Sequence, residues 1–476
     1  MIDPVLASRL QFALTTAVHI LFPAISMGLA PFLVYFTWQS IRSDDPIYTR
    51  QQRFWTKIFA ITFVCGTVTG IVLEFEFGTN FATFSTAVGE LFGGPLATEG
   101  LMAFFLESTF LGVFVFGRER VSDRLYMLSA VLVALGSWLS AVWILVANSW
   151  MQTPRGYEMV QEGGQRAVHL VDPIAAYLNP RFLWMFVHMQ TAAVLSVALL
   201  LAGLAAYHLL RDRDRDFWTL TLKVAVVALL LTAPLQAIQG DAYARHVAET
   251  QPQKFAAMEA IYNTDSGVIE ALIAVPTDLE GFTDPRTTEL FIIGIPGGAS
   301  FLASGGDPTA TIQGLNEFEG MPPVAFVFWS FRLMIALGFW FILLGLWAGY
   351  RWARGGLTDD RRLLQALVIS GGAGLFATEL GWVVTEVGRQ PWLFKGPAGS
   401  MRTAAGVTTS LSGWEATLTL AGFVVGYSAL LVVYVAVVRE MIQTGPPSAA
   451  DLGLDAGAID GDGPDTDTVA EVTNDA

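Results

Sequence analysis

The stretch ISMGLAPFLVYFTW, residues 25–38, contains no charged residue and extends an apolar run that begins near residue 12. A helix needs about 20 such residues to cross the hydrocarbon core of a bilayer. The run follows Arg9 but has no A-x-A-like cleavage site, which argues against a secretory signal peptide. We therefore predict that residues 12–39 form a transmembrane helix.

The rest of the chain repeats this pattern. Hydrophobic residues make up 53% of the 476 residues and charged residues only 14%, against about 25% charged residues in soluble domains. Long apolar runs predict an all-α, polytopic membrane protein with nine transmembrane helices. They lie near residues 12–39, 57–78, 96–117, 126–149, 183–208, 217–239, 323–350, 364–386 and 414–438.

The distribution of Lys and Arg predicts the orientation of these helices. With the amino terminus outside, more than half of the basic residues fall on the inner side. We therefore expect the amino terminus outside and the carboxyl terminus in the cytoplasm. The predicted regions are helices one to six in 1–239, an extracytoplasmic segment in 240–322, helices seven to nine in 323–440, and a tail in 441–476. The tail is acidic and rich in Gly, Asp, Ala and Pro, so we expect a disordered cytoplasmic segment.

The single cysteine, Cys65, excludes several chemistries together. The chain cannot form an internal disulfide, a C-x-x-C-H haem attachment or a cysteine-held iron–sulfur cluster. Cys65 lies in FVCGTVTG, residues 63–70, where Gly66 and Gly70 form a small-xxx-small pattern typical of helix packing. The chain also has no Walker motif and no G-x-G-x-x-G after a strand, so ATP-driven and Rossmann functions have no support.

Polar residues inside the predicted spans are the main functional signal. A charge at the centre of a membrane helix costs about 2.5–3.5 kcal/mol on insertion scales, so such a residue is a functional candidate by default. The set comprises His19, Glu74, Glu99, Glu107, His188, Arg332, Glu379 and Glu386.

Four side chains fall in the outer half of the predicted bundle at 1.5 Å of rise per residue. They are His19, His188, Met334 and Glu386. A lone histidine near a helix end fits a hydrogen-bonded packing role equally well. Two histidines at similar depth, with a Met and a Glu, favour iron ligation, because imidazole, thioether and carboxylate all bind iron. The other histidines, at 169, 208 and 246, are expected to be ordinary surface residues.

Five stretches carry a family resemblance. They are FGTNF (77–81), NSWMQTPRG (148–156), FVHMQTAA (186–193), RLMIALG (332–338) and GWVVTEVGRQPW (381–392). In this order, they resemble subunit I of the cytochrome bd-type quinol oxidases, of the kind with a short Q-loop, and the similarity runs to about residue 440. The resemblance implies an enzyme that oxidises membrane quinol, reduces O2 to water and generates proton motive force with cytoplasmic protons. It also implies a location in the cell membrane and a second subunit as partner.

The resemblance implies three haems: a low-spin haem b, a high-spin haem b and a haem d. His188 and Met334 match the axial ligands of the low-spin haem. His19 and Glu386 match the ligands of the two high-spin haems, where oxygen is reduced, and haem d on His19 is favoured. The other matches are Arg332 beside the low-spin haem, Trp382 one turn from Glu386 and between the macrocycles, and Arg389, Gln390 and Arg9 as cofactor-binding residues.

The longest outer segment contains QPQKFAAMEA, residues 251–260, which resembles the quinol-binding part of the family's Q-loop. Lys254 and Glu259 match the residues linked there to quinol oxidation. Quinol loses two protons with its two electrons, so a carboxylate acceptor near a cation is chemically suited to this role. As a bare pattern, K-x-x-x-x-E is also common on solvated helices.

A proton path is expected on the third and fourth spans. Glu99 and Glu107 lie about 12 Å apart in rise and 80° apart in rotation if the helix is regular. Ser108 and Ser140 add hydroxyl groups, and these four positions resemble the family's proposed proton channel. The simpler interpretation is hydrogen bonding between helices.

Two other classes of protein remain open from the residues alone. A haem b membrane anchor that exchanges electrons with quinone would need histidine pairs but not Glu386. A secondary transporter would use Glu99, Glu107 and Glu379 as an ion path, usually with inverted repeats, and no such repeat is visible.

Overall fold

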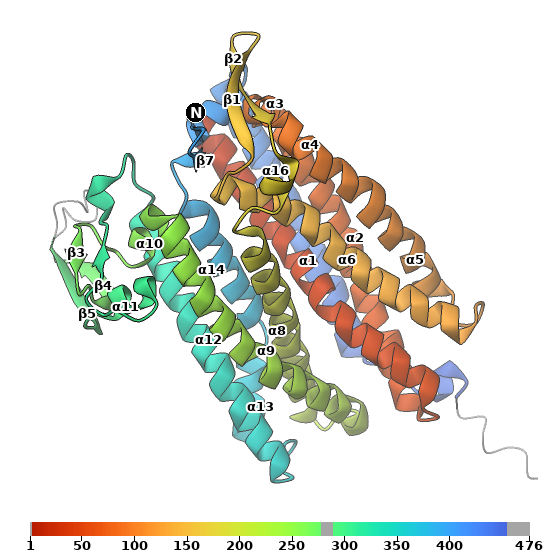
Figure 1. Ribbon diagram of the computed structural model, residues 1–476. Coiled ribbons are helices and arrows are strands. Elements are labelled where there is room, and N and C mark those ends of the chain that lie inside the picture. Colours follow the sequence, from red (N-terminus) through yellow and green to blue (C-terminus); the bar gives the residue numbers. More distant parts are fainter. Residues whose placement is uncertain (1, 278–288, 455–476) are drawn as a thin grey trace, which may run out of the picture.

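A computed structural model describes residues 2–277 and 289–454. Within these residues, nine helices or helix pairs are long and apolar enough to cross a membrane, in agreement with the predicted fold class. They run side by side as a tilted bundle (Figure 1). The spans are Pro4–Arg42 (α1), Pro46–Thr79 (α2), Gly89–Phe116, Asp123–Gln152 (α6), Pro173–Leu209, Arg215–Thr250 (α9), Val324–Ala353 (α12), Arg361–Val387 and Gly413–Thr444 (α16).

Three of the spans are interrupted. The third span consists of α4 (Gly89–Thr98), a π-helical turn (Glu99–Ala103) and α5 (Phe104–Phe116). The fifth consists of α7 (Pro173–Tyr177) and α8 (Phe182–Leu209), and the eighth of α13 (Arg361–Ser370) and α14 (Ala373–Val387). A Cβ atom placed on Gly203 of α8 would lie 2.8 Å from the Cα of Gly371, so two glycines allow the eighth span to approach α8 closely.

Side-chain caps mark where several helices begin. Asp3 and Asp45 each accept a hydrogen bond from the backbone of the first helical turn, and a proline follows each of them. Ser412 and Glu415 form a reciprocal capping box at the start of α16. The sequence thus sets the ends of α1, α2 and α16 locally.

β1, β2 and β7 lie at the end of the bundle where α1 begins, the upper end in Figure 1, and β3, β4 and β5 lie at the left side, beside α11. β1 (Tyr157–Glu162) pairs with β2 (Gln165–Leu170), and β7 (Trp392–Gly396) pairs with β8 (Gly399–Arg402), both antiparallel. Between α9 and α12 lie α10 (Pro252–Met258), β3 (Asp265–Ser266), β4 (Glu270–Pro276), β5 (Leu290–Ile295), α11 (Gly298–Ser304), β6 (Thr311–Ile312) and a 3₁₀ turn (Leu315–Glu317). The short helices α3 (Ala82–Ala87) and α15 (Thr403–Gly406) and a 3₁₀ turn (Ala450–Leu452) complete the described elements.

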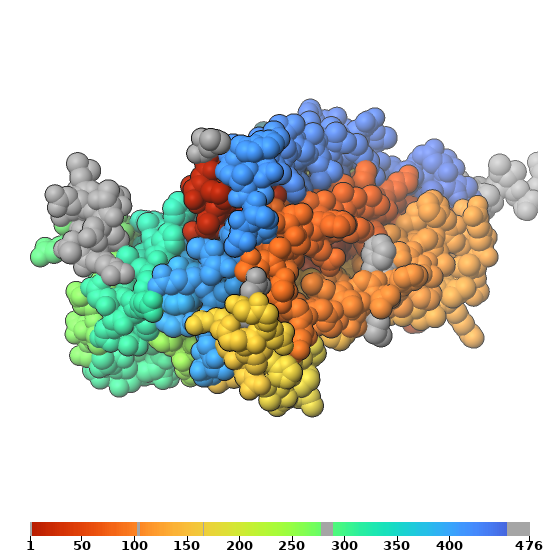
Figure 2. Space-filling model, turned by 90° about the horizontal axis from the view of Figure 1, so that it is seen from above, coloured from red at the N-terminus to blue at the C-terminus, as the bar shows by residue number. Residues whose placement is uncertain are grey.

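Seen from above, the segment between α9 and α12 covers one edge of the molecule, in green, and α4 and α5 lie toward the opposite edge, in orange (Figure 2). The main hydrophobic core lies between α1, α2, α8, α9 and α12, and a second core joins α10 to α12 and α14. The segment between α9 and α12 is therefore packed onto the bundle by buried side chains.

Two expectations from the sequence differ from the structure. The sixth span does not end near residue 239, because α9 continues to Thr250. His208 is not a surface residue: it is 2% exposed, and its ring stacks on Trp218 with the centroids 4.2 Å apart. His169 is exposed as expected, and its Nδ1 lies 3.0 Å from Glu90.

Candidate functional site

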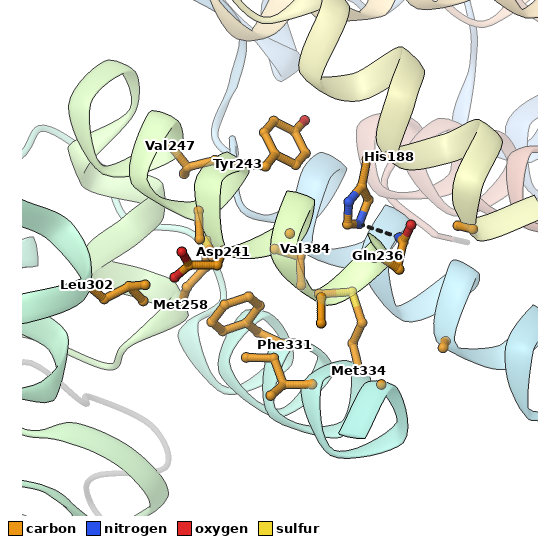
Figure 3. A pocket seen from close by; sticks show the side chains of 18 of the residues that line it. His188, Gln236, Asp241, Tyr243, Val247, Met258, Leu302, Phe331, Met334 and Val384 are labelled. Atoms are coloured by element: carbon orange, nitrogen blue, oxygen red, sulfur yellow. Dashed lines mark hydrogen bonds between the residues drawn. The ribbon is translucent and has the colours of Figure 1, made fainter. Parts of the chain in front are cut away.

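His188 of α8 and Met334 of α12 line one cavity of about 640 Å³ that is partly open. α9 and α14 also line it, with Gln236 and Trp382 among the residues, and α10 and α11 contribute to the wall. Figure 3 shows the imidazole and the thioether in the same pocket, with Gln236 beside the ring. The predicted axial pair, carried by α8 and α12, therefore lines a single cavity.

Two glycines leave room beside these side chains. A Cβ atom on Gly240 would lie 3.4 Å from the Cε1 atom of His188, and one on Gly381 would lie 3.2 Å from the Met334 sulfur. The cavity is lined mainly by apolar side chains, as is usual for cofactor sites. The donor set, the glycine positions and the cavity size fit a flat macrocycle held by His188 and Met334.

The His188 ring is oriented by two glutamines that the sequence analysis did not single out. Its Nδ1 atom is hydrogen-bonded to Gln239 Oε1, and the Gln239 amide donates to the carbonyl oxygen of Trp184 at 3.1 Å. This arrangement places the ring proton on Nδ1 and leaves Nε2 as the coordinating atom. Nε2 lies 3.0 Å from Gln236 Nε2. Both glutamines lie in an otherwise apolar stretch of α9, which is the signal that could have identified them.

His19 of α1 has a comparable partner on α2. Its Nδ1 atom lies 3.0 Å from the Thr69 hydroxyl, and that hydroxyl donates to the Cys65 carbonyl at 2.9 Å. The hydroxyl therefore accepts the proton of Nδ1, and Nε2 is free to bind iron. A Cβ atom on Gly70 would lie 3.1 Å from His19 Cε1, so this glycine leaves space next to the ring.

Glu386 is held by a partly buried polar network. Arg389 donates to its Oε2 atom through Nε at 3.0 Å and Nη2 at 2.5 Å. Asn148 and Gln152 of α6 donate to Oε1 at 3.0 and 3.2 Å. Asn148 and Gln152 belong to the NSWMQTPRG stretch, but their contact with Glu386 was not predicted.

The remaining residues of this helix end form a chain of contacts. Arg389 also donates to the carbonyl oxygen of Leu393 at 2.5 Å. Gln390 accepts hydrogen bonds from Thr403 at 2.8 Å and from the exposed Arg9 at 3.4 Å. The expected cofactor-binding residues Arg9, Arg389 and Gln390 therefore do lie together near Glu386.

Lys254 does not lie at a solvated loop surface away from the iron-ligand candidates, as its place in the Q-loop suggested. It is 2% exposed and lines the His188 cavity. Its Nζ atom donates to Gln152 Oε1 and, at 2.9 Å, to the carbonyl of Thr385. Burial lowers the pKa of Lys254 well below its ordinary range, and the nearby Arg181 lowers it further.

Glu259 is buried on the other side of α10 and forms a salt bridge with Arg332. Arg332 also lies 3.5 Å from Glu270 of β4, so one guanidinium connects two carboxylates. Burial raises the pKa of Glu259 to about 7, and Arg332 acts in the opposite direction. The structure thus directs Arg332 toward Glu259, whereas Met334 of the same helix lines the cavity.

Arg181 is a further buried cation that was not predicted. It lines the cavity seven residues before His188, is 2% exposed, and donates to Gln251 at 2.6 Å. Its Nε atom has no hydrogen-bond partner among the described residues. A buried guanidinium with an available N–H group is suited to bind a carboxylate at the cavity.

Of the four predicted proton-path residues, Glu99 and Ser140 form a pair, Glu107 pairs with an unpredicted serine, and Ser108 contacts neither acid. Ser140 donates to Glu99 at 2.6 Å, and Ser137 donates to Glu107. Ser108 instead donates to the Phe105 carbonyl of its own helix at 3.4 Å. Ser137, which was not predicted, is therefore the hydroxyl that contacts Glu107.

The fold and these sites define a polytopic membrane protein whose side chains are suited to bind haem iron. The family model for cytochrome bd terminal oxidase subunit I matches residues 7–446, and the chain belongs to this family. It is 32% identical to the cytochrome bd ubiquinol oxidase subunit 1 of Bacillus subtilis, over 89% of this chain and 90% of the relative. It is 31% identical to the cytochrome bd-II ubiquinol oxidase subunit 1 of Escherichia coli, over 93% of this chain and 97% of the relative.

A solved structure gives the same result. The bd oxidase from Geobacillus thermodenitrificans superposes with a TM-score of 0.83 and 29% identity, over 93% of this chain and 99% of that chain. The resemblance seen in the sequence is confirmed, and the chain is a subunit of a haem-containing quinol oxidase. This finding favours the oxidase over the haem b anchor and the transporter.

Proposed function

We propose that this subunit holds three haems and couples quinol oxidation to the reduction of O2 to water. In this proposal, His188 and Met334 ligate a low-spin haem b, His19 ligates haem d, and Glu386 ligates a high-spin haem b. When bound, the haems supply the one-electron chemistry that links a two-electron quinol to O2. The observation that carries the proposal is the shared cavity of His188 and Met334 on α8 and α12.

The residues around the cavity would hold and tune these groups. Gln239 and Thr69 fix the tautomers of His188 and His19, and Arg181 offers a guanidinium to a propionate. Trp382 lines the cavity one turn before Glu386, which is consistent with an indole between two macrocycles.

Quinol oxidation is proposed at α10, beside the cavity. Glu259 accepts a proton from the quinol hydroxyl, and its salt-bridge partner Arg332 favours the ionised carboxylate that this step requires. Lys254 lies within hydrogen-bond distance of the backbone next to Glu386, so the proposed quinol site and the iron-ligand helix share a residue contact.

Protons for oxygen reduction are proposed to enter from the cytoplasm along α5 and α6. Glu107 with Ser137 and Glu99 with Ser140 form two successive stations of a polar path. Moving protons through the membrane in this direction generates proton motive force. The amino terminus lies outside in this proposal, and the protein resides in the cell membrane.

A second oxidase subunit is the proposed partner. The relatives above are named subunit 1. Only 6% of the apolar window of α16 is buried within this chain, and 20% of that of the third span, so both present wide apolar faces to lipid or to a partner.

A reduced-minus-oxidised spectrum of the purified protein tests the proposal. A chlorin band in the far red together with b-type bands is expected. Bands of haem b alone would point to an electron-transfer anchor, and the absence of haem would leave only the fold.

A further inference from the structure

Polar side chains form a line between α1 and α2, and the proposed function uses only His19 and Thr69 among them. Ser8, Gln11, Thr15 and His19 recur every three or four residues, so they share one face of α1. Thr69, Glu76 and Asn80 share the facing side of α2. We call these residues the α1–α2 polar line.

Hydrogen bonds connect the line from the start of α1 inward. Asn80 donates to Ser8 at 3.4 Å, and Gln11 donates to Asn80 at 3.3 Å and to Glu76 at 3.2 Å. Thr15 donates to the same carboxylate oxygen, Glu76 Oε1, at 2.7 Å. Thr69 and His19 form a separate contact deeper in the bundle. The hydrogen-bonded part of the line therefore runs from Ser8 to Glu76 and Thr15, and Thr15 lies one helical turn before the predicted iron ligand His19.

Glu76 is the only acid of the line and is almost completely enclosed. It is 1% exposed and forms no salt bridge within the described residues. Its Oε2 atom has no hydrogen-bond partner there, and neither has the hydroxyl of Tyr427, a buried residue of α16 packed against α1 and α2. A carboxylate without a cation is costly in such surroundings. One carboxylate oxygen is thus available to carry a proton.

No cation among the described residues pairs with Glu76. Tyr427 faces it from α16, and His19 lies deeper on α1. Other ionisable groups on the adjoining elements either have another partner or face away from Glu76. Arg9 is exposed and donates a hydrogen bond to Gln390, and Glu74 is exposed on α2. Glu107 of α5 accepts a hydrogen bond from Ser137, and Glu415 caps α16.

Glu76 is close enough to His19 to sense its charge. Thr69, which contacts the ring, precedes Glu76 by seven residues, a rise of roughly 10 Å. At that distance and an effective dielectric constant of about 20, one added electron changes the proton affinity of a carboxylate roughly tenfold. The effect is reciprocal: binding of a proton to Glu76 must raise the electron affinity of the iron at His19 by the same factor.

We propose that Glu76 is a redox-linked proton-binding site. Glu76 binds one proton at Oε2 when one electron, supplied by quinol oxidation, reduces the ferric iron that His19 ligates to ferrous iron. The proton enters from the aqueous phase at the Ser8 end of the polar line and leaves by the same route on reoxidation, so no net proton crosses the membrane. This site rests on the proposed function, since it requires a haem on His19.

A redox titration of the purified two-subunit oxidase, repeated from mildly acidic to alkaline pH, tests the site. The signal of the His19 haem is defined as the one lost in His19→Ala. Its midpoint potential should fall as pH rises, with a slope of at most about 59 mV per pH unit for one proton per electron. Glu76→Gln keeps the shape of the side chain but cannot bind the proton. The midpoint potential of the His19 haem should therefore depend less on pH in this variant. Glu74→Gln is the matched control on the same helix and should keep it.

Infrared difference spectroscopy gives a second readout. The reduced-minus-oxidised spectrum should contain the carbonyl band of a protonated carboxyl that Glu76→Gln removes and Glu74→Gln retains. If Glu76→Gln loses haem, Thr15→Val provides the test: it keeps the carboxyl but removes its shortest hydrogen bond, and should move the pH-dependent range to higher pH.

The outcomes separate the two proposals. If Glu76→Gln leaves slope and carboxyl band unchanged while His19→Ala removes a haem, the proton site is wrong and the haem assignment stands. An equal loss of slope in Glu74→Gln would show a general charge effect and would also overturn the site. If no haem signal depends on His19, the assignment of His19 fails and the proton site fails with it.

Discussion

The side-chain nitrogen of Lys254 donates a hydrogen bond to the carbonyl oxygen of Thr385, and the next residue of α14 is Glu386. The same nitrogen donates to Gln152, which itself donates to Glu386. A residue expected to act on quinol is therefore also part of the network around an iron-ligand candidate.

Lys254→Met should affect both functions for this reason. The variant keeps most of the side-chain volume but removes the donor to Thr385 and Gln152. We expect lower quinol oxidation together with a shift in the spectrum or potential of the haem assigned to Glu386. Lys395→Met, which changes a lysine of β7 that lies over Trp392, serves as the control. Normal haem spectra in Lys254→Met would show that its contacts with α14 are only structural.

Glu259→Ala should reduce quinol oxidation and leave all haem signals in place. Loss of a general base typically slows a reaction by about 10²–10⁴-fold. Because only the deprotonated carboxylate accepts a proton and burial raises the pKa of Glu259 to about 7, quinol oxidation should increase as pH rises through 7. The pH profile of quinol oxidation, together with haem spectra, checks this. Unchanged turnover would remove Glu259 from the quinol site.

Met334→Leu tests the low-spin haem. The substitution conserves volume and usually costs less than about 1.5 kcal/mol of stability, but it removes the sulfur ligand. The low-spin b signal should become high-spin or disappear while the protein remains folded. Met189→Leu changes another methionine of the same cavity and should retain the signal. A low-spin signal that persists in Met334→Leu would exclude Met334 as the ligand.

Gln239→Leu should raise the midpoint potential of the low-spin haem. The Gln239 carbonyl accepts the Nδ1 proton of His188 and so increases the electron density on the ring, which favours ferric iron. Gln239→Glu should shift the potential in the opposite direction because a carboxylate is a stronger acceptor. A spectroelectrochemical titration measures both variants, and shifts of equal sign would contradict the role of the hydrogen bond.

Glu107→Gln should slow oxygen reduction and the membrane potential it generates, while quinol still reduces the low-spin haem. The structure adds a distinction between two serines. Ser137→Ala should resemble a mild form of Glu107→Gln, whereas Ser108→Ala should behave as wild type, since only Ser137 contacts Glu107. Reconstituted enzyme with normal turnover and charge separation in Glu107→Gln would contradict this path.

The spans could be predicted because long apolar runs leave a clear trace in the sequence, whereas the pairing of His188 with Met334 was an expectation from the family resemblance. The contact of Ser137 with Glu107 could not be predicted in this way. A π-helical turn at Glu99–Ala103 lies between the two acids and changes the rotation that a regular helix would give. The 80° estimate therefore did not apply to Glu99 and Glu107.

The burial of Lys254 was missed for a different reason. Polar composition suggested a solvated loop, but α9 extends to Thr250 and brings α10 down against α14. Gln239 was missed because an amide in an apolar run carries no charge, and its role depends on a neighbouring helix. The burial of Lys254 and the role of Gln239 depend on contacts between helices. The order of residues along one helix does not show such contacts.

The continuation of α9 to Thr250 also determines how this enzyme can be re-engineered. The helix that carries Gln236 and Gln239 leads, after Gln251, directly into the helix that carries Lys254. A chimera that exchanges only residues 240–322 would cut through a continuous helix and separate the partners of His188 from the Q-loop. Junctions placed before Arg215 and after Ala353 would transfer the whole unit intact.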